Sequence, residues 1–305
     1  MGYFWVARRF QIMDRPNERS SHTRPVLLGG GVIFFFSLLV YSLFHGFNFP
    51  LLLAGATMIA LTCFVDDLRD LPSWFRMVIQ LAALVLVFYQ PLNGLEAWKI
   101  LLVIVVFTGV LNIYNFMDGI NGMLAIYSFV VVATFGYINL FVVHFVDMQL
   151  IASILLAIVI FGFFNFRTKA FCFSGDVGSV VMGLIVLFLL VAYVKAMPSA
   201  SPSVSQLSFI IVFLADGVLT LLKRFLNGRN VFQPHREHLY ETLTNDLHVP
   251  QLYVSSAYAL LQLLINVGYF MVADKNLYIF VCTLVLVLFY GLFFYYFNQR
   301  KSSQL

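Results

Sequence analysis

A tight group of carboxylates is the first feature of the sequence that is suited to chemistry. Asp66, Asp67 and Asp70 fall within five residues, and Asp66 and Asp70 share one face if a helix continues through them. Adjacent carboxylates repel each other, so this group favours a hard cation such as Mg2+, or a base whose pKa is raised by its neighbour. The structural alternative is a solvated helix end with Arg69 as the countercharge.

A second group combines amides with a carboxylate. Asn112, Asn115 and Asp118 recur at intervals of three residues, so on a helix the two amides are neighbours that face inward. Gly119 and Gly122 follow and allow a bend at which a ligand can approach the backbone. Such a set suits nucleotide edges, sugar hydroxyls or a metal. The structural alternative is a helix C-cap with amide hydrogen bonds between helices.

The stretch FSGDVGS, residues 173–179, comes directly before an apolar run. Gly175 would leave backbone N–H groups at the start of a helix open to a phosphate, and Asp176 could hold the metal that bridges this phosphate. Asp176 could instead cap the helix. Arg167 and Lys169, a few residues upstream, are suited to an anionic ligand or to lipid headgroups.

Histidines and an arginine gather in a later polar loop. His235, Arg236 and His238 offer donors that could bind a diphosphate. The HxxH spacing also suggests zinc, but no third ligand is obvious and the many carboxylates favour a harder ion. Asp216 lies inside an apolar run, where an ionisable residue is either functional or part of an interhelical salt bridge.

The elements that must position these residues are membrane helices. The chain is 61% hydrophobic and 10% charged, whereas soluble domains are roughly 45–50% apolar and about 25% charged. A bilayer core of ~30 Å needs ~20 mostly apolar helical residues. The sequence therefore predicts an all-α fold, a polytopic transmembrane helix bundle that forms a single domain, residues 1–305. Ten spans are predicted at 28–45, 50–65, 74–90, 98–114, 121–145, 149–166, 177–197, 204–222, 251–273 and 277–297.

The distribution of charged residues supports this arrangement of spans. Ten spans place both ends of the chain on one side, here called side A, and 15 of the 18 Lys and Arg residues lie on or next to it. Side A is therefore predicted to be cytoplasmic. Of the 14 acids, 11 lie on or near side A, as do all the polar motifs. The predicted active site is formed by the side-A loops 66–73, 115–120, 167–176 and 223–250.

This inventory favours Mg2+-assisted transfer of a phosphoryl group from a soluble activated donor to a lipid acceptor, because phosphates approach each other only beside groups that absorb their charge. One alternative is a membrane transporter or ion-coupled carrier that uses intramembrane acids, but transporters usually bind near the midplane. Another is a CDP-alcohol phosphotransferase. Its DG motif continues with an arginine, whereas Asp118 and Gly119 are followed by INGM.

Six motifs occur in the order DRPNERSSH (14–22), GGG (29–31), DD (66–67), NxxNxxDGxxG (112–122), GDVGS (175–179) and HREHLY (235–240). With them the chain resembles the polyprenyl-phosphate N-acetylhexosamine-1-phosphate transferase family. The resemblance implies a multi-pass protein of the bacterial inner membrane with its active site facing the cytoplasm. It implies transfer of a sugar 1-phosphate from a UDP-N-acetylamino sugar to undecaprenyl phosphate, with release of UMP and a need for Mg2+ or Mn2+. The HRxHLY form is similar to the branch that starts O-antigen and related glycans.

The same resemblance assigns roles to residues. It implies that Asp66 and Asp67 lie at the lipid-phosphate end, and that Asn115 and Asp118 serve the nucleotide and catalysis. Asp176 is the implied metal ligand, and we expect Asp118 to share that ion. The loop with His235, Arg236 and His238 would bind diphosphate and help to select the sugar. We also expect Asn112, Gly175 and Arg167 to contact substrate.

Two departures from the family pattern stand out. This chain has RPVLLGGG where the branch usually has PTPRGGG, so Arg24 is the nearest replacement for the missing arginine. Relatives usually also carry one more span before DRPNERSSH. The lipid bilayer is an expected partner, nucleic acid is not, and a homodimer stays an open alternative. Direct attack by the lipid phosphate and a two-step route through a covalent intermediate on Asp118 are both compatible with the sequence.

Overall fold

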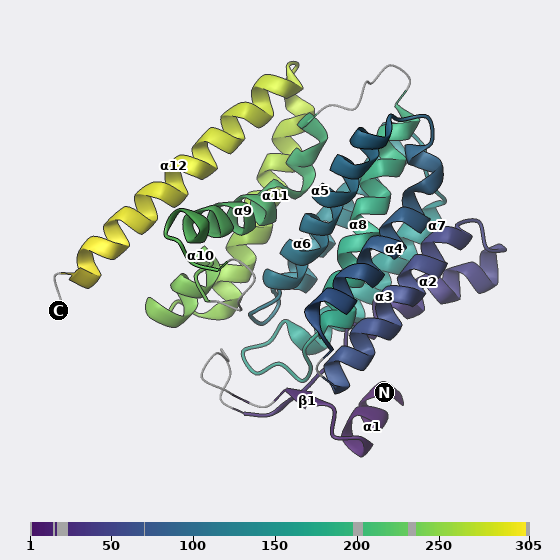
Figure 1. Cartoon of the computed structure of the whole chain (residues 1–305), viewed down its shortest axis with the longest axis horizontal. Coiled ribbons are helices and arrows are strands. Elements are labelled where there is room, and N and C mark those ends of the chain that lie inside the picture. The colour runs from purple at the N-terminus through teal and green to yellow at the C-terminus, as the bar shows by residue number, and fades with distance from the viewer. Residues whose placement is uncertain are drawn as a thin grey trace.

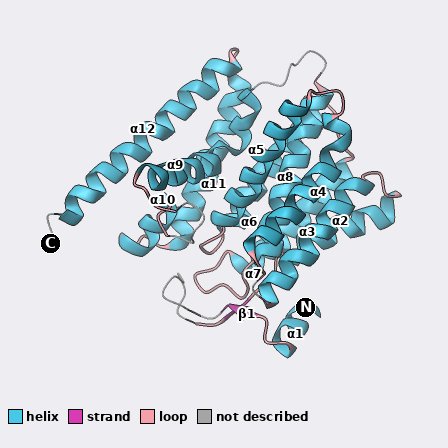
Figure 2. Cartoon of the chain, viewed as in Figure 1, coloured by secondary structure: helices cyan, strands magenta, loops and turns pink. Residues whose placement is uncertain are grey.

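The computed structural model describes residues 2–14, 16, 24–69, 71–197, 204–230 and 236–302, and most of them are helical (Figure 2). The helices are α1 (Gly2–Arg9), α2 (Val32–His45), α3 (Pro50–Leu68), α4 (Ser73–Leu92), α5 (Ala97–Phe116), α6 (Met123–Phe141), α7 (Met148–Asn165), α8 (Asp176–Ala196), the 3-10 helix η1 (Val204–Ile210), α9 (Ile211–Leu226), α10 (Leu239–Glu241), the π-helical turn η2 (Thr242–Asp246), α11 (Gln251–Met271) and α12 (Lys275–Ser302). Two strands of two residues each, β1 (Met13–Asp14) and β2 (Val26–Leu27), pair antiparallel.

The predicted all-α membrane bundle is confirmed. Within the described residues, nine helical segments are long and apolar enough to cross a membrane, with η1 and α9 together forming one of them. The remaining predicted span, 28–45, corresponds to α2, which is shorter and begins only at Val32. The predicted span 121–145 ends earlier, at Phe141, because the Asn139 side chain accepts hydrogen bonds from the backbone N–H groups of Phe145 and Val146 and so turns the chain.

Helix α8 forms the centre of the larger group of helices, with α2, α3, α4, α5 and α6 packed around it (Figure 1). Its residues are apolar on every side, which is typical of a helix enclosed by others. Small residues allow close approach: a Cβ on Gly183 would lie 3.2 Å from side-chain atoms of Leu111 and Tyr114 on α5. This packing brings the beginning of α8 next to the ends of α3 and α5.

A second group consists of α9, α11 and α12, and α12 runs along the outer side of the molecule (Figure 1). Helix α12 packs on η1 and α9, partly through Tyr290 and Phe294, and most of its other large apolar side chains are exposed. These exposed side chains match a helix that faces lipid on most of its circumference.

The span made of η1 and α9 changes helix type at Ile210, where the regular backbone pattern is interrupted inside the bundle. Gln262 of α11 supplies the missing partners. Its Oε1 accepts from the Val212 N–H at 3.1 Å, and its Nε2 donates to the Ser208 carbonyl at 2.8 Å. The same Oε1 accepts from the Tyr127 hydroxyl at 2.7 Å. Irregular backbone at membrane depth is tolerated only where such groups are satisfied by protein or water.

We predict that Gln262→Leu lowers the free energy of unfolding by about 2–4 kcal/mol, because two buried backbone groups would each lose a partner at about 1–3 kcal/mol. Thermal unfolding in detergent measures the effect. Thr62→Val is the matched control, since the Thr62 hydroxyl bonds only to a carbonyl of its own helix. Equal unfolding temperatures for the two variants would contradict a role of Gln262 at the break.

Candidate active site

The aspartates predicted from three separate motifs meet at one end of the bundle. Asp66 lies in the last turn of α3, Asp176 begins α8, and Arg76 lies in the first turn of α4. Arg76 Nη1 donates to Asp66 Oδ2 at 2.5 Å and to Asp176 Oδ2 at 2.9 Å. Arg76 thus joins two acids that are 110 positions apart in the sequence and partly balances their charge.

Amides and backbone N–H groups complete this cluster. Asn115 Nδ2 donates to Asp176 Oδ1 at 2.8 Å and to Ser179 Oγ at 3.0 Å. The Asp176 N–H donates to Asp67 Oδ1 at 3.2 Å, so the carboxylate of α3 lies at the N-terminus of α8. Negative charge is stabilised at that end of a helix. The carboxylate of Asp67 therefore caps α8 from the neighbouring helix α3, and the Asp176 side chain faces the cluster.

Glycines make the close approach possible. Gly175 has a φ of 69°, in the left-handed region, and a Cβ there would collide with the Asp67 carboxylate. Gly178 faces Gly31, whose Cα would lie only 2.7 Å from a Cβ on Gly178. The Gly31 N–H also donates to the Ser174 carbonyl at 3.0 Å. The GGG motif and the GDVGS motif therefore form one contact that fixes where α2 and α8 begin.

Asp118 lies in the turn after α5 and accepts a hydrogen bond from the Ser174 hydroxyl. Burial raises the pKa of the Asp118 carboxyl well above its ordinary value, and the nearby carboxylates of Asp176 and Asp67 raise it further. The cluster thus holds four carboxylates with Arg76 as their ion-paired cation. Such an excess of negative charge calls for a further cation or bound protons.

The donor chemistry of the cluster is that of a hard ion. Among the residues that the structure describes, no three His, Cys, Asp or Glu side chains are grouped as a ready metal site. Asp67 Oδ2, however, is buried without a hydrogen-bond partner, and it lies beside the Gly175 backbone. Carboxylate oxygens with an amide are the donors that Mg2+ or Mn2+ prefer, whereas zinc prefers nitrogen and sulfur.

A second cluster is built around Asp216, which is buried in α9. Its carboxylate accepts from the Leu239 N–H at 3.0 Å and from the Tyr258 hydroxyl at 2.7 Å. It also accepts from the Tyr240 N–H at 3.4 Å, and His238 Nδ1 lies 3.4 Å away. The interhelical salt bridge that the sequence suggested for Asp216 is only part of its role. Its hydrogen bonds also hold the start of α10, and with it the HREHLY loop, against the bundle.

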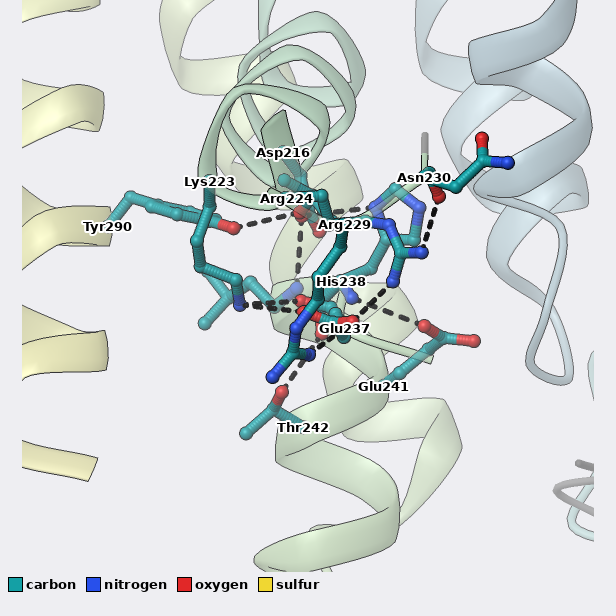
Figure 3. Close-up of polar contacts among 12 residues, drawn as sticks. Asp216, Lys223, Arg224, Arg229, Asn230, Glu237, His238, Glu241, Thr242 and Tyr290 are labelled. Atoms are coloured by element: carbon teal, nitrogen blue, oxygen red, sulfur yellow. Dashed lines mark hydrogen bonds and ion pairs between the residues drawn. The ribbon is translucent and has the colours of Figure 1, made fainter. Parts of the chain in front are cut away.

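Glu237 forms the outer part of the same attachment. Figure 3 shows the side chains of Lys223, Arg224 and Arg229 converging on Glu237, close to where Asp216 faces His238. Arg229 Nη1 donates to Glu237 Oε1 at 2.8 Å, and the buried Arg224 guanidinium donates to the same oxygen. Although burial acts to raise it, the Arg229 hydrogen bond and the neighbouring cations hold the pKa of Glu237 below its ordinary value. Glu237 is therefore charged at neutral pH and binds the end of α9.

Tyr240 joins the two clusters. Its hydroxyl donates to the Phe116 carbonyl at 2.7 Å, at the end of α5. A Cβ on Gly119 would collide with that hydroxyl, so the glycine after Asp118 is needed for the contact. The His238 ring also lies beside Phe116, with 6.2 Å between the ring centroids. The HREHLY loop thus lies against the segment that carries Asp118.

The remaining predicted residues lie elsewhere or cannot be placed. Asn112 Nδ2 donates to the Thr108 carbonyl of its own helix at 2.8 Å, so this amide faces its own helix rather than Asp176. Arg167 lies at the end of α7, between aromatic rings. Arg236 is half-buried at the start of the HREHLY loop. His235, Asp70 and most of DRPNERSSH lie outside the described residues.

Several polar residues of these clusters were not predicted from the sequence. Arg76 was counted only among the basic residues on or next to side A, although its place in the first turn after the DDLRD motif was a usable signal. Ser174 and Ser179 lie within the FSGDVGS stretch, residues 173–179, but their hydroxyls were not predicted to take part. Tyr240 and Glu237 belong to the HREHLY motif, in which attention went to the histidines and arginine.

Comparisons with known proteins bear on this arrangement. Residues 49–194 match the model of the family described as glycosyl transferase family 4. The undecaprenyl-phosphate alpha-N-acetylglucosaminyl 1-phosphate transferase of Escherichia coli K12 is 28% identical over 78% of this chain and 70% of its own length. The proteins of the same name from Yersinia pestis and Thermotoga maritima are each 26% identical, over 80% and 79% of this chain and 73% and 76% of their own lengths.

We predict that Asp216→Ala loosens the HREHLY loop without unfolding the bundle. Hydrogen–deuterium exchange at the Leu239 and Tyr240 amides, which donate to Asp216, should become at least about tenfold faster. One hydrogen bond to a charged group contributes about 1.5–3 kcal/mol. Thr244→Val is the control, because it removes a hydroxyl that bonds only to carbonyls of the same turn. Unchanged exchange in Asp216→Ala would show that other contacts hold the loop.

Proposed function

We propose that this chain is a polyprenyl-phosphate hexosamine-1-phosphate transferase of glycosyl transferase family 4, a proposal supported by the family match of residues 49–194 and by the relatives of that activity. It transfers an N-acetylamino-sugar 1-phosphate from a UDP-sugar to undecaprenyl phosphate and releases UMP. This reaction would be the first membrane step in the synthesis of a cell-surface glycan of the O-antigen type. The observation that carries the proposal is the meeting of Asp66, Asp67, Asp118 and Asp176 with Asn115 at one end of a membrane bundle.

The location of the cluster suits two substrates of opposite solubility. The acids lie at helix ends, where a UDP-sugar can arrive from water and a lipid phosphate can arrive from the bilayer. The HREHLY loop contributes Tyr240 and His238 beside the turn that carries Asp118, and the same loop carries Arg236. Hydrogen-bond donors of this kind stabilise the charge that develops on phosphate oxygens in the transition state.

We propose Mg2+ or Mn2+ as the cofactor, held by Asp176 and Asp118, with Asp67 Oδ2 as a nearby free acceptor oxygen. When bound, such an ion neutralises charge on the diphosphate of the donor. In this proposal Arg76 is a positioning residue, because it holds Asp66 and Asp176 in place from α4.

For the chemical step we favour direct attack. An oxygen of the undecaprenyl phosphate bonds to the phosphorus that carries the sugar, and the bond from that phosphorus to the UMP oxygen breaks, so UMP leaves with the electron pair. Asp66 and Asp67 orient the acceptor. The covalent route would need the Asp118 carboxylate as the nucleophile, but that carboxylate is buried and accepts the Ser174 hydroxyl.

A transporter is the weaker alternative. Carriers usually bind near the midplane between broken helices, whereas this cluster lies at helix ends. The backbone groups at the break at Ile210 are paired with Gln262, and Asp216 accepts from the HREHLY loop and from Tyr258 of α11. Neither feature therefore provides an ion path.

The deciding experiment for the reaction is an assay of purified protein with undecaprenyl phosphate and a panel of UDP-N-acetylamino sugars, with UMP release as the readout. We expect release with one or a few sugars and only when the lipid is present. Proteoliposomes without the lipid should show no net movement of UDP-sugar, and such movement without UMP formation would favour a carrier.

The proposal places the cluster on the cytoplasmic side of a bacterial inner membrane, as the charge bias predicts. Cysteine labelling of intact cells tests the orientation. Lys169→Cys, exposed on side A, should resist a membrane-impermeant reagent, while Glu96→Cys, exposed at the opposite end, should react. The reverse pattern would overturn the orientation.

We predict that Asp176→Asn keeps the fold but lowers turnover by more than ~10²-fold, because charge stabilisation at the reacting centre contributes several kcal/mol. Asn retains the acceptor for Asn115 but removes the charge that faces Arg76. Asp147→Asn is the matched control, since Asp147 bonds to Tyr41 and Asn48 far from the cluster. Near-normal turnover in a folded Asp176→Asn protein would remove Asp176 from the proposed metal site.

The two chemical routes predict different exchange behaviour. A covalent enzyme exchanges labelled UMP into the UDP-sugar without lipid, because its first half-reaction is reversible alone. Direct attack requires both substrates together, so we expect sequential kinetics and no exchange in lipid-free protein. Robust exchange under lipid-free conditions would replace direct attack with the covalent route.

A further inference from the structure

A groove of about 550 Å³ lies between α6 and α7, apart from the carboxylate cluster. Its walls are almost entirely apolar, and one end is formed by Phe166 and the polar side chain of Arg167. The apolar lining includes Ala125, Ile126 and Phe129 of α6 and Val159, Gly162 and Phe163 of α7. Phe129, Val159 and Phe163 are exposed, so the groove opens toward the lipid-facing surface of the bundle.

The length of the groove matches one leaflet of a membrane. It extends along α7 from Ile158 to the residues just after the end of the helix at Asn165. At 1.5 Å per residue this is about 10–13 Å, and half of a hydrocarbon core of ~30 Å is about 15 Å. An acyl chain of one leaflet fits such a groove, whereas most of a much longer polyprenyl chain would extend beyond it.

Arg167 is held in place at the polar end. Its Nε donates to the Phe163 carbonyl at 2.6 Å, and its guanidinium lies 4.5 Å from the Phe163 ring centroid and 5.0 Å from that of Phe171. Asn121 Nδ2 donates to the Arg167 carbonyl at 2.9 Å, so the backbone is fixed as well. Within the described parts of the chain, the two terminal guanidinium nitrogens have no acidic partner. They remain available to an anion at the level of the lipid headgroups.

We propose that this groove binds one acyl chain of an anionic phospholipid from the leaflet on side A, with the lipid phosphate at Arg167. The apolar walls take the chain, and the fixed guanidinium selects a headgroup with net negative charge. Lys169, exposed two residues later, adds to the positive potential. The inference rests on the groove and Arg167 alone and does not depend on the proposed reaction.

The site also contacts the segment after Asp118, through Asn121 and Gly122. Asn121, which holds the Arg167 backbone, lies three residues after Asp118, and its own N–H donates to Gln251 of α11. Gly122 next to it donates its N–H to Asn165 at the end of α7. A lipid that orders the end of α7 therefore also supports the turn that follows Asp118.

Native mass spectrometry of the full chain in detergent tests the proposal, with phosphatidylglycerol, phosphatidylcholine and undecaprenyl phosphate as separate probes. The wild type should retain phosphatidylglycerol in preference to phosphatidylcholine. Arg167→Gln should reduce that preference by about fivefold, because one basic side chain near an anionic lipid surface contributes about 1 kcal/mol. Arg9→Gln removes the same charge from an exposed position on side A outside the groove, and should leave the preference unchanged.

Side chains that fill the groove test whether the groove holds an acyl chain. A Cβ on Gly162 would lie 3.6 Å from the Ala125 Cβ, an ordinary contact, so Gly162→Leu can be accommodated while its side chain occupies the groove. Val159→Trp is a second filling variant at an exposed position. Both should lose bound phosphatidylglycerol, whereas Gly291→Leu, in open space on α12, should retain it.

Two results would overturn the proposal. One is equal retention of phosphatidylglycerol in Arg167→Gln and Arg9→Gln, or in the groove-filling variants and Gly291→Leu. The other is loss of undecaprenyl phosphate, but not of phosphatidylglycerol, in the Arg167 and groove variants, which would assign the groove to the acceptor lipid. The proposed reaction could still hold in either case, because UMP release is measured separately.

Discussion

The contact of Arg76 with Asp66 and Asp176 holds together the part of the molecule on which the site depends. It connects α4 to the end of α3 and the start of α8, and it supplies positive charge beside acids that would otherwise repel one another. The side chains of Arg76 and Asp176 are each about 30% exposed, so solvent reduces the strength of this ion pair. Its importance is therefore positional, because it sets the distance between the helices that carry the clustered acids.

The cost of burying charge explains where each polar group can lie. Carboxylates are costly inside a bilayer, and the main cluster lies at helix ends, where backbone N–H groups of α8 face Asp67. Asp216 lies deeper, and it accepts from two backbone N–H groups and the Tyr258 hydroxyl, with Thr220 Oγ1 also donating at 3.1 Å. A carboxylate with this many donors can be buried, and the donors from residues 239 and 240 fix the HREHLY loop as a consequence.

The helices and the membership of the main cluster could be predicted from the sequence, because long apolar runs and one-sided charge are strong local signals. The start of α2 could not, since Gly29–Gly31 continue an apolar run yet form a backbone contact with residues 173 and 174. Arg76 was also missed as a site residue because its partners come from other helices, and the sequence does not show which helices are neighbours. Asn112 has the same type and spacing as Asn115, but its amide donates to Thr108, so periodicity alone did not separate the two.

Tyr240 connects the two clusters. The acids come from α3, α5 and α8, while the histidine and arginine come from the loop after α9, so the packing of the first group does not by itself position the second. The Tyr240 hydroxyl bonds to the Phe116 carbonyl, and the absence of a side chain at Gly119 leaves room for it. Asp118 lies between these two contacts in the sequence and also accepts from Ser174. A change in the loop therefore reaches Asp118 through two neighbouring backbone positions, which couples the position of the loop to the geometry of the acids.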